Sequence, residues 1–169
     1  MSASHEFSRV VPLSQLGPGP FRQEIAASEN ERNGLAKRFD LLSLDRLSAT
    51  VELLRERGGT ILLTAEFTAE FAQQCVVTLD PVPGKIEAAF SLRYGPPEAE
   101  PVTDGDDDPA FEPLIGEAID IGEAVAQEFS LSLPEFPRAP DAVVERDDQD
   151  KAADGPFAAL ARFVPRKPT

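Results

Sequence analysis

The chain has 169 residues and a mass of 18.3 kDa, which is about the size of one domain. Thirty acidic residues against 16 basic ones give a formal net charge of −14, which excludes a protein that binds nucleic acid through bulk positive charge. One Cys and one His exclude an internal disulfide framework, an all-Cys zinc site and most His-based catalysis. With no apolar run of about 18 residues and no signal-peptide pattern, we expect a cytoplasmic protein without membrane contact.

The first elements expected along the chain are edge strands and one helix. Residues 7–13 and 21–27 are candidate edge strands. Ser28, followed three residues later by Glu31, forms the capping-box pattern that marks the start of a helix. The apolar residues Leu35, Phe39 and Leu42 follow at helical spacing, so this helix has one apolar stripe.

The strongest signal is an alternation of apolar and polar residues, which is typical of strands with one buried face. It extends over residues 47–53, 61–79 and 86–94, and Gly58 and Gly59 between the first two runs indicate a hairpin turn. A single strand over residues 61–79 would be about 60 Å long, at roughly 3.3 Å per residue. We therefore expect a bulge or bend near residues 69–74, or a split into two strands, within three successive antiparallel strands.

Two more helices are expected in the C-terminal half. Asp120 and Glu123 mark the start of one helix, and Pro156 and Pro165 mark the start and end of a short one over residues 156–165. The predicted fold class is α+β: an antiparallel sheet covered by two or three helices. Closure of that sheet into a partial barrel stays open as an alternative.

The negative charge is concentrated in one stretch. Residues 96–125 carry ten acidic side chains and no basic one. Such a segment buries too little apolar surface to become ordered, so residues 95–110 are predicted to be an acidic, disordered surface loop. Residues 134–155 contain three prolines and five aspartates and read as a flexible, Pro-rich linker. The predicted organisation is thus a single α+β domain over residues 1–133, a linker, and the short helix.

Few residues suggest catalysis. Cys75 as a nucleophile would need a base, and a small buried residue on the apolar side of its strand is the favoured interpretation. The run Asp104, Asp106, Asp107 and Asp108 lacks the spacing of a calcium-binding EF-hand loop. It is interpreted as solvated or as a contact for a basic protein. We expect no enzyme activity, no cofactor and no metal site, because phosphate-binding loops, nucleophile elbows and paired metal ligands are missing from the sequence.

Basic residues are the candidates for contact with RNA phosphates. The set comprises Arg32, Lys37, Arg38, Arg46, Arg55 and Arg57. They precede the acidic stretch, and phosphate binding requires several of them on one surface. The simpler alternative is that these side chains are merely solvated.

Three motifs, all C-terminal to residue 73, resemble the YceD-like family of bacterial and plastid proteins, described as large ribosomal RNA subunit accumulation proteins. The first motif is similar to the family's Cys-x-x-Cys-Leu-acid-Pro pattern, with Cys75, Leu79, Asp80 and Pro81 kept and Thr78 in place of the second Cys. The second contains Asp120 and Glu123 and continues to Pro134, and the third begins at Pro156 and Phe157.

The resemblance implies a non-catalytic role in the accumulation or processing of large-subunit ribosomal RNA, or in ribosome assembly. It does not extend to the further C-terminal cysteines of some members, so it implies no zinc site here. Two mechanisms follow as hypotheses. In the first, the basic residues bind ribosomal RNA or a pre-ribosomal particle. In the second, the acidic loop binds a basic ribosomal protein or assembly factor.

Overall fold

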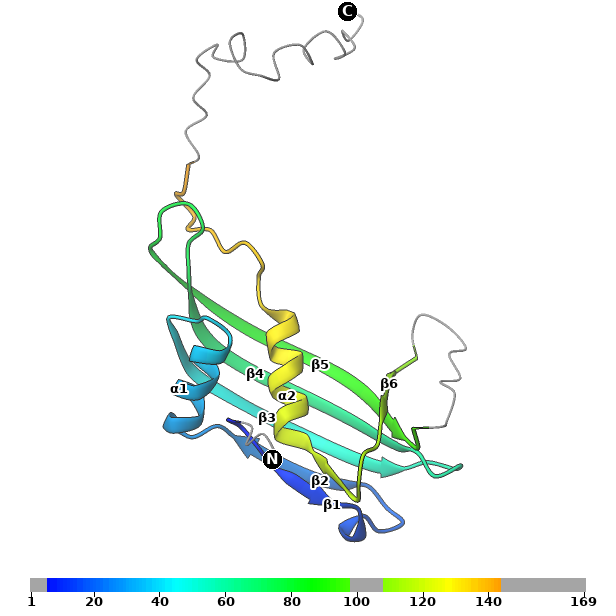
Figure 1. The fold of residues 1–169 in the computed structure, drawn as a ribbon. Helices are drawn as coiled ribbons and strands as arrows, with labels where there is room; N and C mark the ends of the chain where they lie inside the picture. Colours follow the sequence, from blue (N-terminus) through cyan, green and yellow to red (C-terminus); the bar gives the residue numbers. More distant parts are fainter. Residues whose placement is uncertain (1–5, 98–107, 144–169) are drawn as a thin grey trace, which may run out of the picture.

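A computed structural model describes residues 6–97 and 108–143 of the chain. Its elements, in chain order, are β1 (Val10–Pro12), a 3-10 turn η1 (Leu13–Gln15), β2 (Phe21–Ala26), α1 (Glu29–Arg38), β3 (Ser43–Arg55), β4 (Ile61–Gln74), β5 (Pro81–Gly95), β6 (Ala110–Pro113), β7 (Ala118–Asp120) and α2 (Ile121–Ser132). The fold class is α+β, as the sequence predicts (Figure 1).

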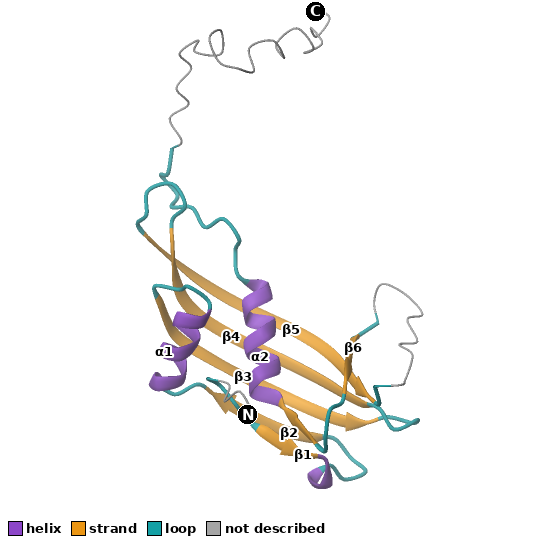
Figure 2. Cartoon of the chain, in the orientation of Figure 1, coloured by secondary structure: helices purple, strands orange, loops and turns teal. Residues whose placement is uncertain are grey.

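The centre of the fold is a five-stranded sheet with the order β2-β3-β4-β5-β6. Strands β2 to β5 are antiparallel neighbours, whereas β6 runs parallel to β5 along Leu92–Gly95. A separate two-stranded ribbon pairs β1 with β7. Both helices lie on the same face of the sheet (Figure 2).

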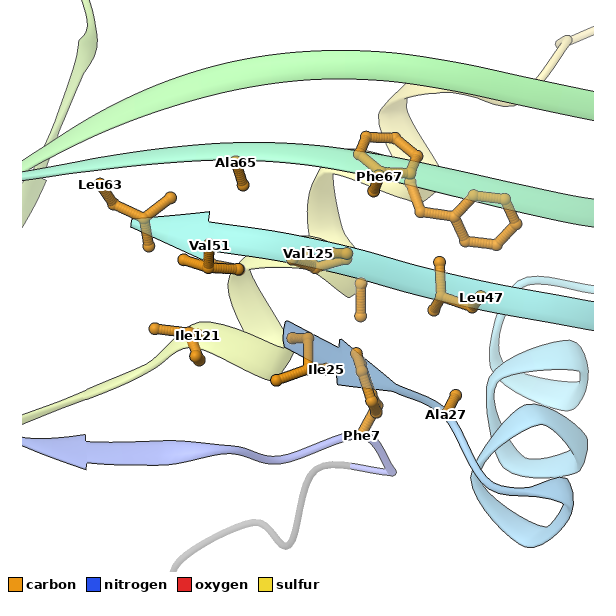
Figure 3. Close-up of a cluster of buried hydrophobic side chains, with 14 of the residues drawn as sticks. Phe7, Ile25, Ala27, Leu47, Val51, Leu63, Ala65, Phe67, Ile121 and Val125 are labelled. Atoms are coloured by element: carbon orange, nitrogen blue, oxygen red, sulfur yellow. The ribbon is translucent and has the colours of Figure 1, made fainter. Parts of the chain in front are cut away.

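The core lies between this face of the sheet and the helices, together with the β1–β7 ribbon. Along β4 every second side chain, from Ile61 to Phe71, is buried, as the alternation in the sequence predicts. The Phe129 ring of α2 packs edge-on against Phe67 and Phe71, with centroids 6.5 and 5.6 Å apart. Figure 3 shows how Val125 of α2 and Phe7 of the N-terminal segment meet the buried side chains of β3 and β4.

Two expectations about the sheet need correction. The sheet is mixed rather than purely antiparallel, because β6 returns alongside β5 in the same direction. It is also not closed into a barrel: in the described residues the outer strands β2 and β6 do not pair with each other. Strand β6 pairs with β5 over only four residues, which leaves the sheet open at that edge.

The long strand expected over residues 61–79 ends earlier, at Gln74. Residues 75–80 form a turn, in which Cys75 N–H donates to Asp80 O and Leu79 N–H donates to Cys75 O. Leu79 lies in the left-handed region with a φ of 67°, which ends the extended backbone. The chain therefore splits here into β4 and β5, one of the two outcomes expected, while the bulge lies elsewhere, between Leu44 and Arg46 of β3.

The helix starts are predicted correctly. Ser28 and Glu31 form a reciprocal capping box at α1, and the Asp120 carboxylate caps α2. Helix α1 ends at Arg38, so Leu42 is not on its stripe and is 51% exposed. The expected third helix at residues 156–165 lies outside the described residues.

Candidate functional site

The second family-like motif connects three segments of the fold. The Asp120 carboxylate accepts hydrogen bonds from the Ser8 hydroxyl at 2.6 Å and from the Arg9 backbone N–H at 2.7 Å. The same carboxylate accepts from the first N–H groups of α2, at Gly122 and Glu123. A Cβ at Gly122 would lie 2.6 Å from the Phe7 carbonyl oxygen, so only glycine allows this close approach. Asp120 thus joins the N-terminal segment to α2.

Glu123 connects α2 to α1 through Arg38. The Arg38 guanidinium donates two hydrogen bonds to the Glu123 carboxylate, at 2.7 and 2.9 Å, and a third to Glu6 at 3.2 Å. The Glu123 side chain is only 9% exposed, and the pair raises the pKa of Arg38 above its usual range, chiefly through the hydrogen bonds to Glu123. Arg38, a predicted RNA contact, is therefore an internal partner of a buried carboxylate.

Two more of the predicted RNA-contact residues are bound to the fold itself. Arg32 donates to the Ala27 carbonyl at 2.8 Å. Arg55 donates to the carbonyl oxygens of Leu13 and Leu16, at 2.7 and 3.3 Å, and so ties β3 to the segment after β1. These contacts occupy part of each guanidinium and fix its position.

Lys37, Arg46 and Arg57 make no side-chain hydrogen bond or ion pair within residues 6–97 and 108–143. They lie far apart. Lys37 is in the last turn of α1, Arg46 is near the start of β3, and Arg57 is in the hairpin turn beyond the other end of β3 (Figure 1). The structure therefore does not bring the six predicted basic residues together on one surface.

The face of the sheet opposite the helices, here called the open face, is polar. Two adjoining hollows of about 760 and 560 Å³ lie on it. The polar residues that line them are Arg22, Glu24, Arg46, Ser48, Thr50, Glu52, Thr64, Glu66, Thr68, Glu87, Ser91 and Asp108. Of these residues only Arg46 and Asp108 are among the site residues predicted from the sequence, although the polar positions of the alternating strands mark the rest of the surface. Asp108 places one end of the predicted acidic loop at the rim of the open face.

The turn at residues 75–80 holds the first family-like motif. Cys75 is buried but lies outside the main hydrophobic cluster. Its sulfur accepts hydrogen bonds from the backbone N–H groups of Val77 and Thr78 at 3.4 Å and of Ala139 at 3.3 Å. The hydrogen bond from the Thr78 side chain, followed by those from these backbone N–H groups, lowers the pKa of the Cys75 thiol to about 6.

Residues 134–143, the first part of the predicted linker, pack against this turn (Figure 1). Gln73 donates to the Pro134 carbonyl at 3.1 Å, and Val76 N–H donates to the Pro137 carbonyl at 2.9 Å. With the Ala139 contact to Cys75, three hydrogen bonds join the two segments. The rest of the predicted linker, the motif residues Pro156 and Phe157, and Asp104, Asp106 and Asp107 lie outside the described residues.

Within the described part of the chain, no group of three or more His, Cys, Asp or Glu side chains is arranged to hold a metal ion. In the same residues, no helix has both the length and the apolar character needed to cross a membrane.

Comparison with known proteins identifies the family. The family model described as large ribosomal RNA subunit accumulation protein YceD matches residues 63–163, which is more than half of the chain. The chain therefore belongs to the YceD family, as the three motifs predict. The match begins within β4 and covers the turn at residues 75–80 and α2. No curated protein and no solved structure gives a significant match.

Proposed function

We propose that this protein supports the accumulation of large-subunit ribosomal RNA as a non-catalytic module that binds a basic ribosomal protein or assembly factor. The family description supports the connection with the large ribosomal subunit. The choice of a protein over RNA as the direct partner rests mainly on one observation. Of the six basic residues that are candidates for phosphate contact, Arg32, Arg38 and Arg55 are held by internal partners.

The remaining candidates are poorly placed for phosphate binding. Lys37 is on α1, Arg46 is on the opposite, open face of the sheet, and Arg57 is in the hairpin turn after β3, whereas phosphate contacts need several cations on one surface. RNA-binding sheets also stack bases on aromatic side chains. Two aromatic residues, Phe67 and Phe90, border the hollows of the open face. Their rings point towards the core, where they pack edge-on with centroids 6.2 Å apart.

A basic protein fits the same surface better. The carboxylates of Glu24, Glu52, Glu66 and Glu87 outnumber the two cations, Arg22 and Arg46, among the residues that line the open face. The acidic stretch at residues 96–125 adjoins this face at Asp108. Carboxylates attract lysine and arginine side chains and repel phosphates, so they select for a basic protein and against RNA.

Paired charge variants test this proposal. The acidic variant carries Asp104→Asn, Asp106→Asn and Asp107→Asn, and the basic variant carries Lys37→Gln, Arg46→Gln and Arg57→Gln. Each removes three charges and leaves the ion pairs of Arg38 intact. We expect the acidic variant to lose association with pre-ribosomal particles in co-sedimentation, and the basic variant to keep it.

The opposite result, in which the basic variant dissociates and the acidic variant stays bound, would establish direct RNA contact and overturn the proposal. Thermal unfolding of both variants serves as the control, since surface charge changes alter stability little.

A further inference from the structure

Leu79 has an unusual combination of backbone conformation and exposure. Its φ of 67° lies in the left-handed region, which a branched side chain rarely adopts, and its side chain is 65% exposed. Glycine or asparagine would adopt this backbone at lower cost. The turn thus exposes an apolar side chain to solvent and keeps the backbone of the same residue strained. A turn with a purely structural role requires neither.

The turn is also firmly held. Its two ends are joined by the hydrogen bond from Cys75 N–H to Asp80 O at 2.8 Å. The Cys75 sulfur accepts two N–H groups from within the turn and a third from Ala139 in the neighbouring segment. Leu79 is therefore displayed on a fixed support, and a partner would bind it without ordering the turn first.

Other apolar side chains are exposed on the same two joined segments. They are Val76 at 47%, Leu79 at 65%, Phe136 at 71% and Val143 at 75% exposed. These four residues are here called the turn surface. Figure 1 shows both segments together beyond the end of β4 and the start of β5. Grouped exposed apolar side chains are typical of an interaction site.

The charges around the turn surface are mainly negative. Asp80 follows Leu79, Glu135 precedes Phe136, and Asp141 lies two residues before Val143, against the single cation Arg138 in residues 134–143. Apolar side chains with acidic neighbours complement a segment in which apolar residues alternate with lysine or arginine.

We propose that the turn surface is a docking site for an apolar, basic segment of a protein of the large ribosomal subunit. The inference rests on the proposed function, because it assigns the same kind of partner a second contact. The open face and acidic loop attract the basic partner by charge, and the turn surface buries its apolar side chains. Leu79 and Phe136 are the central contacts of this site.

Site-specific photo-crosslinking in the full-length chain tests the proposal. A photoreactive residue replaces Leu79 or, in a second protein, Phe136, and each is mixed with the proteins extracted from purified large ribosomal subunits. We expect both positions to crosslink to the same segment of one basic protein. Ile115 is a matched control position, since it is 84% exposed and lies in the loop before β7, away from the turn.

Affinity measurements on the crosslinked protein, once purified, complete the test. We expect Leu79→Gly to weaken its binding about tenfold, the effect of leaving one leucine-sized side chain out of the interface, while Ile115→Gly leaves it unchanged. Because glycine relieves the strain at position 79, the melting temperature of Leu79→Gly should not fall. If Leu79→Gly loses binding but keeps its melting temperature, the loss is due to the missing contact with the partner and not to unfolding.

Three results would overturn the docking site. They are equal binding by Leu79→Gly and Ile115→Gly, crosslinks from position 79 to residues 144–169 of the same chain, and crosslinks to ribosomal RNA. If a basic protein still binds and only the acidic variant described above weakens it, the proposed function stands and the docking site fails. If the mixture contains no protein that binds the wild-type chain, the docking site fails. The proposed function itself fails if, in addition, no basic assembly factor extracted from pre-ribosomal particles binds the chain.

Discussion

Cys75 shows how much of a residue's environment is decided by distant parts of the chain. The alternation in the sequence places it on the apolar side of a strand, and it is indeed buried. Its sulfur, however, is a hydrogen-bond acceptor for three backbone N–H groups, one of which comes from Ala139, 64 residues further along. Local pattern predicts burial, whereas it carries no information about such a long-range donor.

The Cys75 thiol gives a pH-dependent prediction. Its pKa in the folded protein is lowered from 9.0 to about 6, so the folded state favours the thiolate. The resulting stabilisation is fully present above pH 9, where the unfolded thiol is also ionised, and is lost as the pH falls towards 6. We expect the free energy of unfolding of the wild type, relative to Cys75→Ser, to rise between pH 6 and 9. If the difference in unfolding free energy between the wild type and Cys75→Ser is the same at pH 6 and pH 9, the pKa of the Cys75 thiol is not lowered in the folded protein.

Arg38 illustrates the limits of sequence analysis at a candidate site. A basic residue at the end of a helix resembles a phosphate contact, but its partner Glu123 lies 85 residues away. Removing the arginine would leave a buried carboxylate unpaired. We expect Arg38→Met to lower the free energy of unfolding by about 2–3 kcal/mol.

Two further variants complete this prediction. The double variant Arg38→Met and Glu123→Met should recover much of the loss, because no unpaired charge remains. Lys85→Met is the matched control: its ion pair with Glu87 is exposed and screened by solvent, so its loss should change the free energy of unfolding little. Chemical denaturation measures all three. Equal effects of Arg38→Met and Lys85→Met would show that Arg38 is an ordinary surface residue.

At the scale of elements, strands β3 to β5 were the most predictable part of the fold, because one buried face imposes a period of two on the sequence. The start of each helix was equally clear from its capping residues. The parallel strand β6 was not predictable. It has four residues, Pro109 precedes it, Pro113 is its last residue, and its pairing with β5 is non-local.

The sheet assignment makes a stability prediction. Phe67 and Phe71 are each 3% exposed and contact the Phe129 ring across the core. We expect Phe67→Ala and Phe71→Ala each to cost about 3–5 kcal/mol of unfolding free energy. Phe136→Ala is the control, since that ring is 71% exposed and its loss should change the melting temperature little. Unchanged melting of both core variants would refute the assignment.

For the whole molecule, the sequence gives the net charge of −14 but not its distribution in space. The fold exposes one polar face of the sheet to solvent, and Asp108 of the acidic stretch lies at the rim of this face. Three of the six candidate phosphate-binding cations make internal contacts instead. This distribution of charged groups favours a basic protein, rather than RNA, as the direct partner.

The most direct test of this central claim compares the two partners in one assay. The 169-residue chain is titrated, at several matched salt concentrations, with large-subunit ribosomal RNA freed of protein and with the proteins extracted from the same subunits. The account predicts saturable binding to a basic protein and none to the RNA. Saturable binding to the RNA that weakens linearly with salt on logarithmic axes, and that Lys37→Gln, Arg46→Gln and Arg57→Gln together abolish, would contradict it.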